Sequence, residues 1–132
     1  MTMNRIDKTG ALVATNGEVI FYSNETDERT DRLNPSLSAN FVEIVSQDID
    51  GNAVIPTAGS YEIYVQQVIT GNFRAIADEG TVDATLTGGE AMADGTGVSS
   101  SFVGNPIAVK VKAIGVDVAA QFYAVITQNE NA

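Results

Sequence analysis

The sequence predicts an all-β protein, a β-sandwich or jelly roll of about eight or nine short antiparallel strands. Apolar and polar side chains alternate with a period of two along most of the chain, as they do in half-buried strands. Turn-forming groups such as TNG, DIDGN and GNP recur about every ten residues, and no convincing amphipathic helix separates them. At 132 residues the chain has the size of one domain with a single core.

Residues 1–10 are expected to form an N-terminal arm that pairs with a neighbouring molecule, and residues 11–132 to form a single β-sandwich domain. Nine segments of this domain have the composition of strands. In chain order they are Ala11–Thr15, Glu18–Ser23, Phe41–Gln47, Ser60–Val68, Phe73–Ala77, Thr81–Leu86, Val98–Val103, Ile107–Ile114 and Gln121–Gln128.

The segment Ile107–Ile114 has the clearest alternation, with apolar residues on one face and Lys110 and Lys112 on the other. Two interpretations of the lysines agree with this pattern. They either protect the edge of a sheet from pairing with another chain, or they line a solvated face.

The segment Gln121–Gln128 is apolar or amphipathic on both faces, because Phe122, Ala124 and Ile126 alternate with Tyr123 and Val125. A central strand, covered on its outer side by long side chains from its neighbours, is the preferred explanation. The alternative is that Tyr123 and Val125 lie at a contact between subunits.

Two long loops are expected, at residues 23–36 and 87–101. The first is polar and carries Glu28 and Arg32 at helical spacing, but a solvated loop is preferred over a short helix. The second contains four glycines and one large apolar residue, Met92. Loops of this length in a compact β domain are usually functional or disordered, and docking on a larger lattice would order them.

Composition argues against most enzymatic chemistry. The chain has no His and no Cys, so the usual catalytic triads and most transition-metal sites are missing. A glycosidase needs only two carboxylates, and Glu43 and Glu62 could lie on adjacent strands, but the aromatic platforms that bind sugars are scarce. We therefore expect a protein that is not an enzyme and has no catalytic residues and no cofactor.

Charge argues against a nucleic-acid partner. Seventeen acidic and seven basic residues give a net charge of −10, which repels phosphate. No apolar run is long enough to span a membrane or to act as a signal peptide, so no membrane partner is expected.

The segment DIDGN resembles the start of a calcium-binding loop, because Asp48, Asp50 and Asn52 present oxygens at every second position. The glycine comes too early, however, and no Glu stands at the twelfth position, which is Gly59. A hairpin turn with Asp50 and Gly51 at its tip is preferred, and no metal site is expected.

Two stretches within residues 60–129 carry a resemblance to a known class: ITGNFRAIADEGTVDATL and GNPIAVKVKAIG with FYAVITQN. Their pattern of residues resembles that of hairpins in the minor virion proteins of tailed bacteriophages, particularly capsid decoration or cement proteins. The resemblance implies a subunit of the virion, assembled in the host cytoplasm, that binds the outside of the head and ties neighbouring major capsid proteins together. It also implies a homo-oligomer, a dimer or a trimer.

For such a role, six residues are the expected contacts, drawn from the outward faces of strands and from the two long loops. They are Tyr64, Tyr123, Val125, Met92, Arg29 and Arg32. A tail or connector subunit and a receptor- or carbohydrate-binding β module remain the alternatives.

Overall fold

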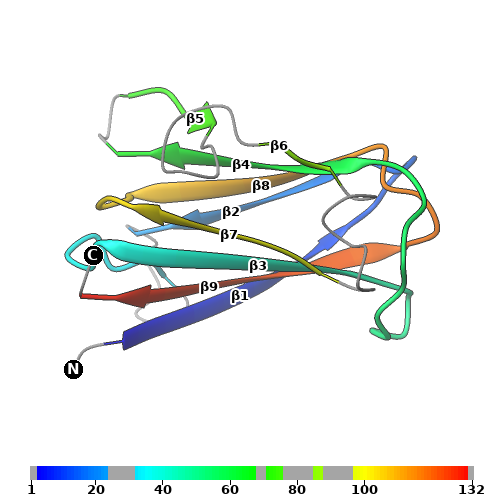
Figure 1. The fold of residues 1–132 in the computed structure, drawn as a ribbon, viewed down its shortest axis with the longest axis horizontal. Helices are drawn as coiled ribbons and strands as arrows, with labels where there is room; N and C mark the ends of the chain where they lie inside the picture. Colours follow the sequence, from blue (N-terminus) through cyan, green and yellow to red (C-terminus); the bar gives the residue numbers. More distant parts are fainter. Residues whose placement is uncertain (1–2, 24–31, 68–70, 76–84, 88–96, 131–132) are drawn as a thin grey trace.

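The computed structural model describes residues 3–23, 32–67, 71–75, 85–87 and 97–130, which form two antiparallel β-sheets packed face to face and contain no helix (Figure 1). The four-stranded sheet has the order β1 (Met3–Ala11), β9 (Gln121–Asn129), β3 (Ala39–Gln47), β7 (Gly97–Val103). The five-stranded sheet has the order β2 (Gly17–Tyr22), β8 (Ala108–Ile114), β4 (Ser60–Gln66), and both β5 (Arg74–Ala75) and β6 (Thr85–Thr87) pair with β4. The all-β prediction is therefore confirmed, with seven strands of six residues or more and two short ones.

The path of the chain is that of a jelly roll. Successive strands β1 to β4 alternate between the two sheets, and so do β7, β8 and β9. The order β1-β9-β3-β7 faces β2-β8-β4-β5, which is the strand arrangement of a double-sheet jelly roll. The first and the last strands are neighbours, so the N- and C-terminal strands lie side by side.

Strand β8 follows the alternation that the sequence predicts. Val109, Val111 and Ala113 are buried between the sheets, and Lys110 and Lys112 point to the outer side. The proposal that these lysines protect a sheet edge is wrong, because β8 is hydrogen-bonded to β2 on one side and to β4 on the other. They lie instead on the outer face of an interior strand.

Strand β9 is central, as the preferred interpretation of its two apolar faces requires. It pairs with β1 over residues 3–11 and with β3 over residues 39–47. Val125 points outward and is nevertheless only 5 % exposed. The neighbouring strands therefore cover much of the outer side of β9 within one molecule.

The N-terminal segment was expected to be an arm that pairs with a neighbouring molecule, but its described residues pair within the chain. Residues 3–10 belong to β1, which is in register with β9 from Met3 opposite Asn129 to Ala11 opposite Gln121. The predicted strand Ala11–Thr15 is wrong, because the chain turns there and Ala14 and Thr15 have positive φ angles of 51° and 68°. The strand was hard to recognise because Ile6 is its single large apolar residue in the core.

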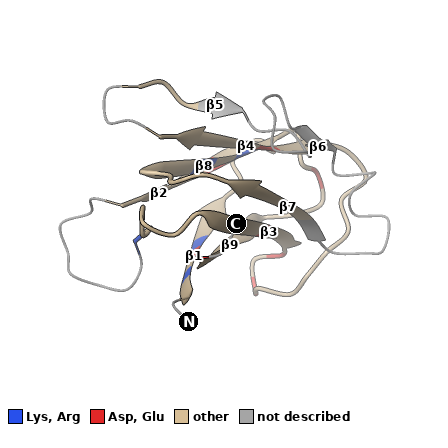
Figure 2. Ribbon diagram, turned by 60° about the vertical axis from the view of Figure 1, so that its left-hand side comes forward, with Lys and Arg blue, Asp and Glu red and all other residues tan. Residues whose placement is uncertain are grey.

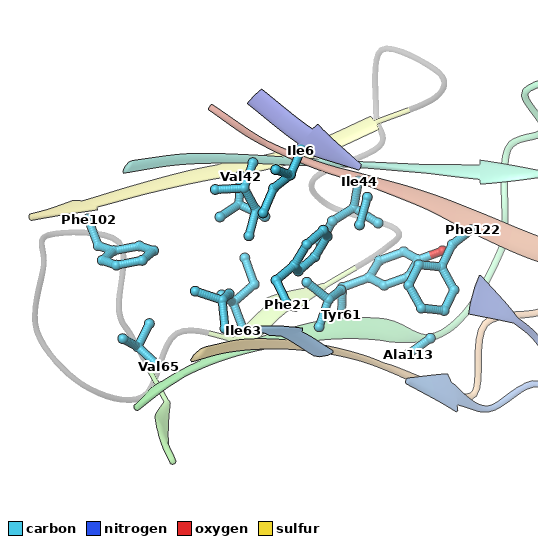
Figure 3. Close-up of a cluster of buried hydrophobic side chains, with 14 of the residues drawn as sticks. Ile6, Phe21, Val42, Ile44, Tyr61, Ile63, Val65, Phe102, Ala113 and Phe122 are labelled. Atoms are coloured by element: carbon cyan, nitrogen blue, oxygen red, sulfur yellow. The ribbon is translucent and has the colours of Figure 1, made fainter. Parts of the chain in front are cut away.

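The core lies between the two sheets and is built around three aromatic side chains, Tyr61, Phe21 and Phe122 (Figure 3). The rings of Tyr61 and Phe122 approach from opposite sheets, with centroids 5.6 Å apart. The Tyr61 hydroxyl shares a 2.6 Å hydrogen bond with Ser46 Oγ on β3, which satisfies both buried hydroxyls. Burial raises the pKa of Tyr61 above its ordinary value, and the bond to Ser46 acts in the opposite direction.

A cluster of amide side chains closes one end of the four-stranded sheet. Gln128 is fully buried; its Oε1 accepts hydrogen bonds from Asn4 Nδ2 and the Asn34 amide, and its Nε2 donates to Asn34 O and Asn40 Oδ1. Asn40 Nδ2 in turn donates to backbone carbonyls, including that of Gly104 at 2.9 Å. The cluster ties β1, β3, β9 and the segment before β3 together.

Most of the two expected long loops, residues 24–31 and 88–96, lies outside the described residues. The described remainder of the first loop crosses the end of the sandwich, where Leu33 and Leu37 are buried. Residues 97–101, at the end of the second, belong to β7.

Candidate interaction surface

The carboxylates that a glycosidase would need do not meet. Glu43 points outward from β3 in the four-stranded sheet, and Glu62 points outward from β4 in the five-stranded sheet. The two side chains therefore lie on opposite outer faces of the sandwich. The expectation that they could sit on adjacent strands is wrong, because β3 and β4 belong to different sheets.

The segment DIDGN forms the expected turn. Residues Gln47 and Ala53 form a β-bridge across it, and Gly51 adopts a φ of 87°. The Asp48 carboxylate accepts hydrogen bonds from the Asn52 and Asp50 amides at 2.9 Å each. These bonds, led by that from Asn52, lower the pKa of Asp48. In the described ranges, no three acidic residues gather as a metal site would require.

An open hollow of about 480 Å³ lies at one end of β2 and β8. Its lining consists of Asn16, Gly17, Glu18, Lys112, Ala113 and Ile114. Glu18 and Lys112 are register partners with opposite charges, so the hollow presents a balanced pair of charges.

The part of the chain that the structure describes contains no helix that could cross a membrane.

The outer face of the four-stranded sheet carries few charges, and its charged side chains among the described residues are Arg5, Asp7 and Glu43. The registers place Thr9, Tyr123 and Val45 in one row across the sheet, and Asp7, Val125 and Glu43 in the next. Three large apolar side chains on this face are solvent-exposed: Met3 (63 %), Phe41 (40 %) and Val103 (66 %). The structure thus brings Tyr123 and Val125, both expected contacts, onto one face.

Two of the charges on this face neutralise each other. Arg5 Nη1 lies 3.9 Å from Asp7 Oδ2, and the Tyr123 hydroxyl donates a hydrogen bond to the same carboxylate. The bond to Asp7 raises the pKa of Tyr123 above its ordinary value. Glu43 is left as the uncompensated charge among the described side chains of β1, β3, β7 and β9 on this face.

The outer face of the five-stranded sheet has a different character. The Lys110 ammonium lies over the rings of Tyr64 and Phe73, 4.9 Å and 4.7 Å from their centroids. The Tyr64 hydroxyl donates to Glu62, and this bond raises the pKa of Tyr64. Tyr64, an expected contact, is therefore engaged with charged neighbours of its own sheet, on the face opposite to that of Tyr123.

Of the three remaining expected contacts, one lies among the described residues. Arg32 is exposed at one end of the sandwich, where its carbonyl accepts a hydrogen bond from Asn4 Nδ2. Arg29 and Met92 lie outside the described residues. Phe41, Val103 and Met3, which were not among the predicted contacts, share the face of Tyr123. The alternation of side chains along β3 and β7 could have indicated the outward positions of Phe41 and Val103.

The fold is a jelly roll, and comparisons with known proteins give few matches. No family model and no curated protein matches the sequence. Among solved structures, the chain is similar to a Bacillus endospore appendage, described as one of a family of disulfide-linked pili, with 14 % identity and a TM-score of 0.39 over 98 % of this chain and 88 % of that chain. It is also similar to a cleaved adhesin domain of Lys-gingipain from Porphyromonas gingivalis, with 11 % identity and a TM-score of 0.40 over 98 % of this chain and 91 % of that chain.

Proposed function

We propose that this protein is a non-enzymatic structural subunit of a tailed-bacteriophage particle, a capsid decoration or cement protein. It binds the outside of the head and stabilises the shell by tying neighbouring major capsid proteins together. The observation that carries the proposal is the outer face of the four-stranded sheet, with its exposed apolar side chains and few charges. The virion is its place of action, after assembly in the host cytoplasm.

Charge makes this face suitable for docking. The protein carries a net charge of −10, so most of its surface resists association with other acidic proteins. On this face Arg5 and Asp7 offset each other, and burying it would desolvate few uncompensated charges. Aromatic and aliphatic side chains, here the exposed Phe41 and Val103 and the half-buried Tyr123, are typical of the centre of a protein interface.

The size of the face also agrees with docking. Three strands of nine residues and one of seven, spaced by about 4.8 Å, cover about 550 Å² as a flat sheet, without the added area of the side chains. A standard specific interface buries about 800 Å² per partner. Many copies bound to one shell add avidity, so a contact of this size is sufficient.

The non-enzymatic assignment rests on composition and placement. Without His and Cys, a catalytic site would have to use carboxylates, lysines or tyrosines. Glu43 and Glu62 are on opposite faces, and the hydroxyls of Tyr64 and Tyr123 are bound to neighbouring carboxylates. Jelly rolls occur in viral capsid proteins and in lectins, so the fold agrees with both a shell protein and a sugar-binding module.

The test is to locate the protein on virions and to measure its binding to purified heads that lack it. Phe41→Glu places a second uncompensated charge on the proposed face, and Ile114→Glu is the matched control on the other sheet. The two side chains are 40 % and 38 % exposed, so their substitution perturbs folding to a similar degree. We expect Phe41→Glu to weaken head binding more than tenfold and Ile114→Glu to leave it unchanged.

Three outcomes would overturn the proposal: labelling of the tail, labelling of no particle, or equal binding by the two variants. Binding of the purified protein to a glycan panel or to host cells would favour a receptor- or carbohydrate-binding module instead. Rings formed by the protein alone would favour a tail-tube or connector subunit.

A further inference from the structure

The two sheets differ in how their edges are protected. Strand edges normally carry charges, are short or are covered, because free N–H and C=O groups invite another strand. At the β2 edge, Ile20 O accepts a hydrogen bond from Lys8 Nζ at 2.8 Å, and Tyr22 O accepts one from the Leu33 amide at 3.1 Å. The β1 edge carries Arg5 and Asp7, and β5 and β6 are two and three residues long.

Among the described residues, strand β7 has none of these protections. Its seven residues, Gly97–Val103, include no charged residue and no proline, and its described part carries neither blue nor red in Figure 2. It pairs with β3 on one side, and no described segment pairs with its other side. An uncharged edge of this length is a template for a further strand.

The hydrogen bonds at the end of β7 show which residues present their backbone to this free edge. The Gly104 amide donates to Ser38 O at 2.9 Å, one step beyond the pair Val103–Ala39. Since antiparallel partners alternate between bonded and non-bonded pairs, residues 100 and 102 also bond β3. The N–H and C=O groups of Gly97, Ser99, Ser101 and Val103 therefore point away from β3.

Ser100, at the middle of β7, carries an orphaned polar group. Its side chain points to the inner side of the sheet and is 8 % exposed, yet its Oγ has no hydrogen-bond partner in the described structure. Buried hydroxyls are normally satisfied, because removal from water without a new hydrogen bond is costly. A new strand at the free edge would place its own side chains beside this hydroxyl.

We propose that two copies of the protein pair through β7, antiparallel and with Ser100 on the twofold axis, so that their four-stranded sheets become one sheet of eight strands. The occupant of the free edge is thus a second copy of this chain.

The proposed register satisfies both the backbone and the orphaned side chain. With Ser100 opposite the partner's Ser100, Ser99 lies opposite the partner's Ser101, and Gly97 opposite the partner's Val103. These are the residues whose backbone groups face outward, so every one of them gains a bonded partner. Ser100 then forms a non-bonded pair, in which Cα atoms are about 4.5 Å apart and side chains are closest, and the two hydroxyls can bond each other.

The pairing does not depend on the proposed capsid role, although it would extend it. The two low-charge faces would join into one face of about 1,100 Å² that could bridge two capsid subunits. Measurements on the purified protein without capsids test the dimer, so its failure is distinguishable from a failure of head binding.

The first experiment uses the absence of cysteine from the chain. Ser100→Cys places a single thiol on the twofold axis, where the Cα separation lies within the range that a disulfide spans. Ser99→Cys is the matched control, because Ser99 is exposed but lies diagonally from its own copy in the dimer. Under mild oxidation of the full chain, we expect Ser100→Cys to form a covalent dimer at least tenfold faster than Ser99→Cys, despite its burial.

The second experiment tests the register by charge. Ser99→Lys with Ser101→Lys sets lysine opposite lysine, whereas Ser99→Glu with Ser101→Lys sets glutamate opposite lysine. By sedimentation equilibrium, we expect the first pair to weaken the dimer at least tenfold and the second to retain it. The first pair also lowers the net negative charge, so weaker association could not come from general repulsion.

Two results would overturn the inference. One is a wild-type chain that sediments as a 13.9 kDa monomer at about 100 µM together with faster oxidation of Ser99→Cys than of Ser100→Cys. The other is a dimer to which the two charge variants respond alike, which would place the contact elsewhere.

Discussion

Gln128 illustrates how much a single side chain can organise when it is buried with all its partners. It is a glutamine inside the sandwich, and its amide group makes four hydrogen bonds to Asn4, Asn34 and Asn40. Each bond adds little net stability by itself, but an unpaired buried donor or acceptor is costly. The network therefore stabilises this end of the sheet, because its loss would leave buried donors and acceptors without partners.

Gln128→Leu should lower the free energy of unfolding by about 3 kcal/mol, since it leaves the Asn34 amide and Asn40 Oδ1 without their hydrogen-bond partners. Urea unfolding followed by intrinsic fluorescence measures the change. Gln121→Leu is the control on the same strand. Gln121 bonds Gln47 on the outer, half-buried side, so its loss should cost less than about 1 kcal/mol. Equal costs for the two variants would contradict this account.

The sequence did not indicate this role for Gln128. Alternation within β9 places Gln128 on the same face as Phe122, Ala124 and Ile126, but a polar residue near a strand end normally suggests solvent. Its partners come from β1, β3 and the segment before β3, far away in the sequence. Such a cluster follows from the register of three strands, which no local pattern specifies.

At the scale of elements, the connections at one end of the sandwich are fitted to each other. The β3–β4 connection contains Gly59, with a φ of 109°, and a Cβ at this position would lie 2.5 Å from Gly115 O and Val116 Cα in the β8–β9 connection. Asp117 of that connection accepts hydrogen bonds from the Thr57 and Ala58 amides. The two loops thus support each other.

Gly59→Ala should destabilise the protein by about 3 kcal/mol, because it combines backbone strain with a collision that only backbone movement can relieve. Gly51→Ala is the matched control. Gly51 also has a positive φ, 87°, but no heavy atom lies within 4 Å of the added Cβ. Its cost should be the strain alone, about 1 kcal/mol. Thermal unfolding of both variants checks the difference, and a larger cost for Gly51→Ala would refute it.

Strands with dense apolar alternation could be predicted from sequence, and β8 is the best example. The central position of β9 also followed from its two apolar faces. By contrast, β1 could not be recognised, since Asn4 and Lys8 take inward positions where a strand usually places apolar residues. Their polar ends are satisfied by Gln128 and by Ile20 O, contacts that exist only after the chain has folded.

At the scale of the whole molecule, the net charge of −10 opposes the self-association that we propose. Two acidic subunits repel each other over a distance set by the Debye length, which falls from about 20 Å at 20 mM salt to about 4 Å at 500 mM. The β7 edge itself contains no ion pair that salt could weaken.

The dissociation constant of the dimer should therefore fall several-fold when sodium chloride is raised from about 20 mM to about 500 mM. Sedimentation equilibrium at a series of salt concentrations measures this dependence. A dimer that weakens steadily with salt would show that ion pairs hold it, and the contact would then not be at β7.

The candidate surface was predictable only in part. Tyr123 and Val125 are two residues apart on β9, and this spacing is enough to place them on one face. Phe41 and Val103 join them only through the pairing of β3 with β9 and with β7. Tyr64 was predicted among the same contacts, but the strand order puts it on the opposite face, and strand order cannot be read from periodicity.

The side-by-side placement of β1 and β9 has a practical consequence. Met3 and Asn129 are register partners at the edge region opposite to β7 (Figure 1). Because β1 is the edge strand opposite to β7, Met3 lies three strand spacings from the proposed contact. In the paired form, the two N-terminal strands would be separated by seven strand spacings, about 34 Å, a span well suited to energy transfer between attached fluorophores.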